Sequence, residues 1–459
     1  MEAKQLIFLA ATVGFIPVAS WLGCRYRWAE RSLVAGAFFS TCYLIDINLV
    51  SMEWYRGDTR GFEFGLTDWM IISLIIVMTR SRRWASEDIK TFPPNSTMLL
   101  VYLFVATASM LVAYVPVYSG FGIAKLVRSL AVYWVAFNYL RRKEDLVFIL
   151  YILAAIVCLE FFLVLKQRAF GIYRAVGTTP HPNTLAMYIN MMNMIFLSFI
   201  LNDENAGRRR WLYIACIGMG SLIVAATFSR GGLVMMIGGY GLVTAISYLR
   251  RPTGRKTALI GVMGIMALGA TAKFGPAIVD RFQNAPEESG LSRGQANDAA
   301  IAMANNHMLG VGLNNYSHVI NNTAYSRFIP NEVDRGIVHN IYLLHACEMG
   351  WIGLFAFLAV IGNFLLMATK SMFRSRNDSI LWVGIGIFAG MSGFWTQSFL
   401  EWAFRQTYLT VEFFMLAGFL AALPQLARAE RRRERRQLLA MLAYSRSRPG
   451  ASTPVGALR

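Results

Sequence analysis

The sequence predicts an all-α polytopic integral membrane protein, and three observations lead to this fold class. Of the 459 residues, 56% are hydrophobic and only 15% are charged. The mean hydropathy of +0.45 exceeds what a soluble domain normally carries. Apolar runs of bilayer length recur along the chain. Basic residues gather in alternate connections between these runs, which is the pattern of the positive-inside rule.

The apolar runs predict about 12 or 13 transmembrane helices. The first run has no small-residue cleavage site after it and no basic stretch before it, so we expect it to be retained as a helix. The third run is short, and the eighth and ninth are almost continuous. The thirteen runs cover residues 5–23, 32–51, 66–79, 96–116, 122–140, 145–165, 182–201, 212–228, 230–249, 257–272, 340–369, 380–399 and 406–427.

The net charge of +18 is explained by topology rather than by a nucleic-acid partner. The connections after odd-numbered runs, with the C-terminal tail, hold 29 of the 44 Lys and Arg residues. Those after even-numbered runs, with the N-terminal end, hold 13, and two lie inside the fifth run. The positive-inside rule then predicts a cytoplasmic C-terminal tail. It places the N-terminus and the long segments 52–65, 166–181 and 273–338 on the opposite, trans face.

This topology divides the chain into five parts, of which the large trans loop offers the most room for a water-facing function. The five cysteines lie far apart without a CxxC pair, so we expect no disulfide framework and no metal site. The parts are N-terminal transmembrane helices 1–165, central transmembrane helices 166–272, the large loop 273–338, C-terminal transmembrane helices 339–427 and a basic tail 428–459.

Short helices are expected inside the loop 273–338. Ser292 can cap a helix, and the apolar positions between 299 and 308 follow an amphipathic pattern. The "GVGLNNY" that comes next is a turn signal. It lacks the third glycine and the preceding strand of a dinucleotide site.

Four polar residues on the trans side are candidates for chemistry: Arg230, Arg281, Arg293 and His339. Each also has an ordinary interpretation. Arg230 could be a snorkelling arginine that anchors a helix end, Arg281 and Arg293 could be solvated loop residues, and His339 could be a structural hydrogen-bonding residue. An intramembrane arginine, however, is costly unless it faces a partner or a polar cavity.

The combination of arginines and one histidine on the same face favours a particular reaction. Arginine forks bind phosphate oxygens, and helix N-termini add N–H donors. Histidine can take a proton from a hydroxyl at neutral pH. We therefore expect glycosyl transfer from a lipid diphosphate, with the arginines stabilising the charge that develops on the leaving group.

Three stretches carry a family resemblance. They are "FSRGG" (228–232), "SGLSRGQ" followed by "NNHMLGVGLNNY" (289–316) and "VHNIYLLHACEMGWIGL" (338–354). In this order and spacing the chain resembles the O-antigen ligase and O-antigen polymerase superfamily of bacterial envelopes. "PHPNTLAMY" (180–188) is similar to the family's Pro-Asn element. The first 165 residues match only as generic membrane helices.

The resemblance implies a GT-C-like, metal-independent glycosyltransferase without a cofactor. Its donor would be a glycan on undecaprenyl diphosphate, and its site would lie on the periplasmic face of the bacterial inner membrane. Carried over by position, His339 is the general base, Arg230 and Arg293 bind the diphosphate, and Arg281 assists. Asn340 and Glu348 support the site, while His345 and His181 receive no chemical role.

The resemblance leaves the acceptor open, and two other protein classes compete with it. A ligase uses a lipid A core sugar, a polymerase a growing polysaccharide, and a protein-glycosylating relative a side-chain hydroxyl. A flippase for lipid-linked oligosaccharides would also hold diphosphate on arginines. The "GMSGF" at 390–394 is similar to an intramembrane serine protease motif, but all five histidines precede Ser392. Small-residue helix packing is the better interpretation there.

Overall fold

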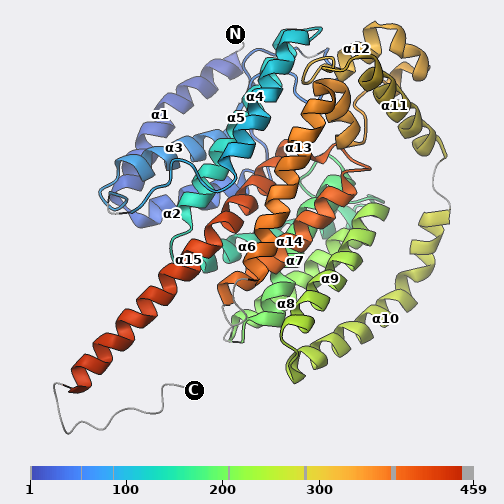
Figure 1. Ribbon diagram of the computed structural model, residues 1–459. Helices are drawn as coiled ribbons and strands as arrows, with labels where there is room; N and C mark the ends of the chain where they lie inside the picture. The colour runs from blue at the N-terminus through green and yellow to red at the C-terminus, as the bar shows by residue number, and fades with distance from the viewer. Residues whose placement is uncertain are drawn as a thin grey trace.

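The computed structural model is built almost entirely of helices, and a helix coincides with each of the thirteen predicted runs (Figure 1). The structure describes residues 3–52, 54–85, 87–204, 207–283, 287–373 and 379–446. Within these residues the α-helices are α1 Ala3–Arg25, α2 Arg27–Phe39, α3 Leu66–Arg80, α4 Ser96–Ala108, α5 Pro116–Tyr139, α6 Lys143–Ala169, α7 Pro182–Asn202, α8 Arg209–Ala226, α9 Arg230–Arg250, α10 Gly254–Gln283, α11 Glu287–Asn306, α12 Tyr316–Asn322, α13 Ile341–Phe373, α14 Ser379–Gln397 and α15 Thr407–Arg446.

The remaining regular elements are short. Four 3₁₀ turns are η1 Ser109–Val112, η2 Ala324–Phe328, η3 Glu332–Asp334 and η4 Ala403–Arg405. The strands β1 Asp46–Asn48 and β2 Glu63–Gly65 pair antiparallel, with Ile47 opposite Phe64.

Nine helices of the described chain are long and apolar enough to cross a membrane. They are α1, α5 to α9 and α13 to α15, and the multi-pass membrane fold is thereby confirmed. The predicted run 32–51 is wrong in its second half, because α2 ends at Phe39. Asp46 and Asn48 interrupt the apolar stretch there, and the backbone instead forms β1 and hydrogen-bonds to β2. The loop between the two strands thus projects toward the site described below.

The centre of the helix bundle is α7, which is buried from Thr184 to Asn202. It packs against α14, α8 and α9, while α15 packs along α5. The helices α1 to α3 form a separate N-terminal layer, with α2 also touching α6. The polar loop that precedes α7 is therefore attached to the most buried helix of the bundle.

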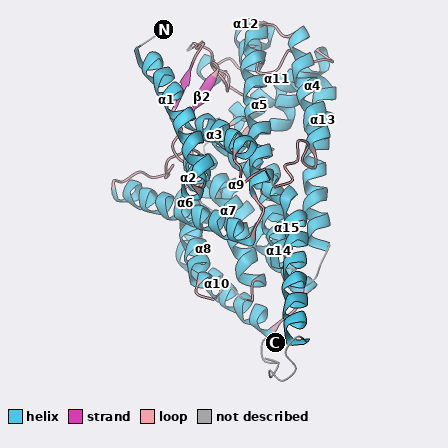
Figure 2. Ribbon diagram, turned by 90° about the vertical axis from the view of Figure 1, so that its left-hand side faces the viewer, coloured by secondary structure: helices cyan, strands magenta, loops and turns pink. Residues whose placement is uncertain are grey.

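The predicted loop region contains more helix than its sequence indicated. The helix α10 continues to Gln283, and α11 begins at Glu287, before the predicted cap at Ser292. In Figures 1 and 2, α11 and α12 lie at the same end of the molecule as the N-terminus. The C-terminal end of α15 extends from the opposite end.

A glycine turn fastens this region to α13. Gly350 has φ +69° and breaks the helical path of α13, which leaves carbonyl groups of the preceding turn without helical partners. The amide of Val311 donates to the Cys347 carbonyl at 2.9 Å, and that of Gly312 donates to the Glu348 carbonyl at 2.8 Å. A Cβ on Gly310 would lie 2.3 Å from the Glu348 carbonyl oxygen. The turn at 310–312 and the break at Gly350 therefore pack directly against each other.

Candidate functional site

Asn340 immediately precedes α13, and His339 is the residue before Asn340. The Asn340 Oδ1 atom accepts hydrogen bonds from the amides of Tyr342, at 3.0 Å, and Leu343, at 3.2 Å. This is the hydrogen-bonding pattern of a helix N-cap. The amide of Ile341 donates to the carbonyl of Ser398 at 3.1 Å, which brings the start of α13 to the end of α14. His339 is thereby placed beside the segment 398–402.

Glu401, in that segment, is the centre of the site. Its side chain is only 4% exposed, and its Oε2 atom lies 3.4 Å from Nδ1 of His339. The Arg293 Nη2 atom donates to Oε1 at 3.2 Å, and the Asn183 side-chain amide also donates to Oε1. Three elements distant in sequence therefore converge on one carboxylate.

The charge on this carboxylate is stabilised by its partners. Burial acts to raise the pKa of Glu401, but the hydrogen bond and charge of His339 and the charge of Arg293 outweigh burial and hold the pKa below its usual range. An ionised Glu401 can only accept hydrogen bonds. When the imidazole of His339 is neutral, the hydrogen bond to Glu401 therefore requires the proton on Nδ1, and Nε2 then has a free lone pair.

Arg293 reaches Glu401 from α11, and its side chain remains 33% exposed. The helix is held in place because Tyr316 donates from its hydroxyl to the Ala296 carbonyl at 3.1 Å and α11 packs on α13. One face of the guanidinium is thus engaged by Glu401. The Arg293 side chain makes no other hydrogen bond or ion pair with the described residues.

Arg230 is the first residue of α9 and lies outside this cluster. Ser229 caps the helix by accepting from the Gly232 amide at 3.2 Å. Among the described residues, no hydrogen bond or ion pair involves the Arg230 side chain. The start of α9 lies beside the end of α14, since a Cβ on Gly231 would be 3.5 Å from Gln397. Arg230 therefore lies at the start of α9, next to the C-terminal end of α14.

Arg174 connects the Ser-Arg-Gly region with Glu401. Its Nε donates to the Thr227 carbonyl at 3.1 Å and its Nη2 donates to the Asn183 Oδ1 atom at 3.1 Å. Asn183 in turn donates to Glu401. The predicted site residue Arg281 falls in the part of α10 whose side chains lie outside the described residues, so its assisting role stays a prediction.

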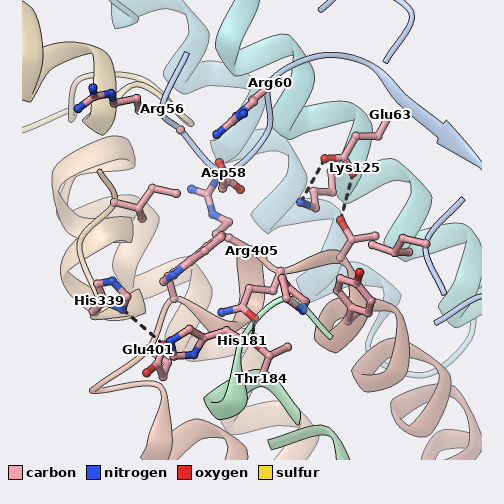
Figure 3. A pocket seen from close by; sticks show the side chains of 18 residues that line it. Arg56, Asp58, Arg60, Glu63, Lys125, His181, Thr184, His339, Glu401 and Arg405 are labelled. Carbon is pink, nitrogen blue, oxygen red and sulfur yellow. Dashed lines mark hydrogen bonds and ion pairs between the residues drawn. The ribbon is translucent and has the colours of Figure 1, made fainter. Parts of the chain in front are cut away.

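A cavity of about 430 Å³ opens beside His339 and Glu401 (Figure 3). Its walls come from the β1–β2 loop, α5, the start of α7 and the segment before α15. Neither Arg293 nor Arg230 is among its lining residues, although Arg293 contacts Glu401, which does line the cavity. The lining residues are Leu44, Arg56, Gly57, Asp58, Arg60, Glu63, Lys125, Pro180, His181, Thr184, Ile337, His339, Glu401, Trp402, Arg405, Gln406, Thr407 and Tyr408.

A second charge cluster surrounds Glu348, one of the predicted supporting residues. Its Oε2 atom accepts from Arg405, and its Oε1 atom accepts from the Tyr316 amide at 3.2 Å. Arg405 also lies 3.7 Å from Asp58. Burial acts to lower the pKa of Arg405, but Glu348 and Asp58 outweigh it and raise the pKa, which keeps the guanidinium charged. This cluster joins α13, the β1–β2 loop and η4.

The two histidines without a predicted chemical role lie in different settings. His345 is completely buried, with Nε2 2.7 Å from the Tyr102 hydroxyl and the ring stacked on Phe357. His181 caps α7 by accepting from the Asn183 amide at 3.2 Å, and it also lines the cavity. Burial lowers the pKa of His181, which favours the neutral ring.

Sequence reasoning missed Glu401, Arg174 and Arg405, and it gave no role to Asn183 of the Pro-Asn element. The available signal was "SFLEWAFRQ" at 398–406, which places one acidic and one basic residue between two apolar runs on the trans side. Intramembrane and interfacial charges of this kind usually have a polar partner. Among the residues described, no group of three or more His, Cys, Asp and Glu side chains could hold a metal ion.

Two comparisons with known proteins bear on the site. A family described as O-antigen ligase matches residues 214–358. Over the matched residues, this finding supports the resemblance to the O-antigen ligase and polymerase superfamily that the motifs indicated. The matched part contains Arg230, Arg293 and His339, whereas Glu401 and most of the cavity lining lie outside it. No curated protein matches the chain significantly.

Proposed function

We propose, with the O-antigen ligase and polymerase superfamily as the premise, that this membrane protein is a glycosyltransferase of the ligase or polymerase type. It transfers a glycan from undecaprenyl diphosphate to a hydroxyl group of an acceptor glycan, either a lipid A core or a growing polysaccharide. The observation that carries the proposal is the convergence of His339, Glu401 and Arg293 beside a polar cavity. The site then faces the periplasm, and the protein lies in the bacterial inner membrane.

His339 is the general base of this reaction. Its Nε2 atom accepts the proton of the acceptor hydroxyl while the hydroxyl oxygen forms a bond to the anomeric carbon of the donor sugar. The bond between that carbon and the diphosphate oxygen breaks, and the electron pair leaves with the lipid diphosphate. The imidazolium that forms beside Glu401 is stabilised by the carboxylate 3.4 Å away.

Glu401 positions the base rather than reacting. By accepting from Nδ1 it selects the tautomer in which Nε2 is the base, as the carboxylate does in a Ser-His-Asp triad. By accepting from Arg293 it also fixes the distance between the base and a candidate phosphate ligand. A mutation of Glu401 should therefore affect both the removal of the acceptor proton by His339 and the binding of the diphosphate by Arg293.

The arginines receive the leaving group. Arg293 is only partly occupied by Glu401, so its remaining N–H groups are free to bind diphosphate oxygens. Arg230 adds a second guanidinium at the N-terminus of α9, where the helix dipole also favours an anion. Arg281 is proposed as a weaker assistant on α10. Positive charge at this place stabilises the transition state, in which negative charge grows on the diphosphate.

The test is glycan and lipid profiling of a deletion strain complemented with wild type, His339→Gln or Arg293→Ala. Single lipid-linked repeat units accumulate if the protein is a polymerase, and long polymer is retained on the carrier if it is a ligase. The same accumulation is expected for both variants at normal expression. Full restoration of the glycan by both variants would contradict the proposal and favour a flippase of lipid-linked oligosaccharides.

A further inference from the structure

The cavity beside His339 has an excess of positive charge on the side formed by the β1–β2 loop. Figure 3 shows Arg56 and Arg60 on that side, well separated from His339 and Glu401. Both arginine side chains are exposed. The distribution of ion pairs decides whether this charge is already neutralised.

Each acidic residue of the lining already has a cationic partner. Asp58 pairs with Arg405, and Glu401 pairs with Arg293 and His339.

Glu63 also pairs, at 3.4 Å with Arg128 and at 3.9 Å with Lys125. Every carboxylate of the lining is therefore already paired with a cation, and none pairs with Arg56 or Arg60.

Arg56 and Arg60 have no such acid. The Arg56 guanidinium donates to the Glu332 carbonyl, and no ion pair joins it to a described residue. The Arg60 side chain makes neither a hydrogen bond nor an ion pair with the residues that the structure describes. The fork of each guanidinium group matches the geometry of a phosphate or a carboxylate, which it can bind bidentately.

The rest of the lining has the character of a sugar site. Thr184, Gln406 and Thr407 are polar lining residues, with Thr184 donating to Gln406 at 2.5 Å and Thr407 donating to Glu63 at 3.1 Å, and Trp402 and Tyr408 add aromatic side chains. The volume of about 430 Å³ lies within the range of small-molecule sites. Arg230 and Arg293, the proposed donor ligands, are not among the lining residues, and Arg293 contacts Glu401, so the proposed donor site and this cavity meet at the His339–Glu401 pair.

We propose that the cavity is the acceptor subsite and that it selects a glycan bearing a phosphate or carboxylate group, which Arg56 and Arg60 bind while a hydroxyl of the same glycan reaches His339. The inference rests on the proposed function. It adds the chemical class of the acceptor and the residues that recognise it. An uncharged acceptor leaves the two guanidinium groups without a counterion and binds more weakly.

The test measures binding of monosaccharide probes to the full chain in phosphatidylcholine nanodiscs, by saturation-transfer NMR. The probes are glucose 6-phosphate, glucuronate and glucose. Wild type is expected to bind both anionic probes about tenfold more tightly than glucose, the size typical of a charge-assisted hydrogen bond. The double variant Arg56→Gln/Arg60→Gln is expected to lose this preference. Equal binding of glucose by wild type, or a preference that survives in the double variant, would overturn the proposal.

Two matched variants locate the effect. Arg327→Gln removes an exposed arginine of η2 that does not line the cavity, so the preference should persist. Arg230→Gln/Arg293→Gln removes the proposed donor ligands, and the preference should persist there too. Its loss in this second variant would assign the anion to the donor side and overturn the proposal.

Two further experiments follow. The first distinguishes a glycan anion from a lipid headgroup, and the second distinguishes failure of this inference from failure of the proposed function. Addition of phosphatidylglycerol to the nanodiscs should leave the preference unchanged, whereas its disappearance would assign Arg56 and Arg60 to a lipid headgroup. His339→Gln should retain the preference while transfer is lost. If His339→Gln transfers normally, the proposed function fails, and the preference for anionic sugars is judged separately.

Discussion

The two charge clusters of the site have similar components but differ in how open they are. Glu401 binds His339 and Arg293, whose side chains are 39% and 33% exposed. Glu348 binds Arg405, and both of these side chains are almost completely buried, at 3% and 6% exposed. The open cluster can exchange a partner for a substrate without unfolding. The closed cluster cannot, so we assign chemistry to the first and stability to the second.

The position of α13 explains how one helix serves both clusters. His339 precedes its first turn, and Glu348 lies on the last turn before the break at Gly350. The glycine turn at 310–312 is hydrogen-bonded at that break. The buried cluster of Glu348 and Arg405 therefore supports the helix whose start places His339 at the cavity.

The largest effect is expected for His339→Gln. Loss of the general base should lower turnover by about 10²- to 10⁴-fold. Glutamine can still donate to Glu401, so the thermal stability should change little. Turnover and melting temperature of the purified protein check this together, and a large fall in melting temperature would place His339 with the stability residues.

The closed cluster should respond in the opposite way. Arg405→Gln leaves Glu348 and Asp58 as buried acids without a cation, which costs about 3–5 kcal/mol of folding stability. Unfolding by heat in detergent measures the loss. Normal stability together with strongly reduced turnover would show that Arg405 takes part in the reaction.

A smaller effect is expected for Glu401→Gln. The amide no longer imposes one tautomer on His339 and no longer balances Arg293, so turnover should fall about 10- to 100-fold, as for other partners that orient a histidine. The pH dependence of turnover should change as well, which a purely structural role would not cause. Asp at position 401 is the matched control, since it keeps the charge and should recover part of the activity.

The smallest effect concerns acid stability. The pKa of Glu401 is held below its ordinary value in the folded protein, so its ion pairs stabilise the fold above that ordinary value and lose this contribution only as the pH falls through the lowered pKa. Melting temperatures measured at decreasing pH should therefore fall more in wild type than in Glu401→Gln. Parallel curves for the two proteins would contradict the assigned pairing.

The fold was predictable because hydropathy and charge act along the chain. A run of apolar residues must become a helix in lipid, where the backbone has no other hydrogen-bond partner. The prediction failed at 40–51, where a run of this length contains Asp46 and Asn48 and turns back into β1. The start of α11 was also missed, although the acidic residues Glu287 and Glu288 are typical of a first helical turn.

The site was only partly predictable, for a different reason. His339 and Arg293 stand in motifs, and so could be singled out. Glu401 has no motif around it, and its importance arises from contacts with residues 62 and 108 positions away. Separations of that size are set by the packing of α7, α13 and α14, which no local pattern encodes. The cation-rich wall of the cavity likewise exists only because β1 and β2 direct their loop toward η4.

The most direct test of the reaction centre is a single-turnover assay with purified protein and a lipid-diphosphate-linked donor. Release of the lipid diphosphate and binding of the donor are measured separately for wild type, His339→Gln and Glu348→Gln. We predict that His339→Gln binds donor with unchanged affinity and releases almost no diphosphate, while correctly folded Glu348→Gln still reacts. Release at the wild-type rate by His339→Gln would contradict the assignment of the base.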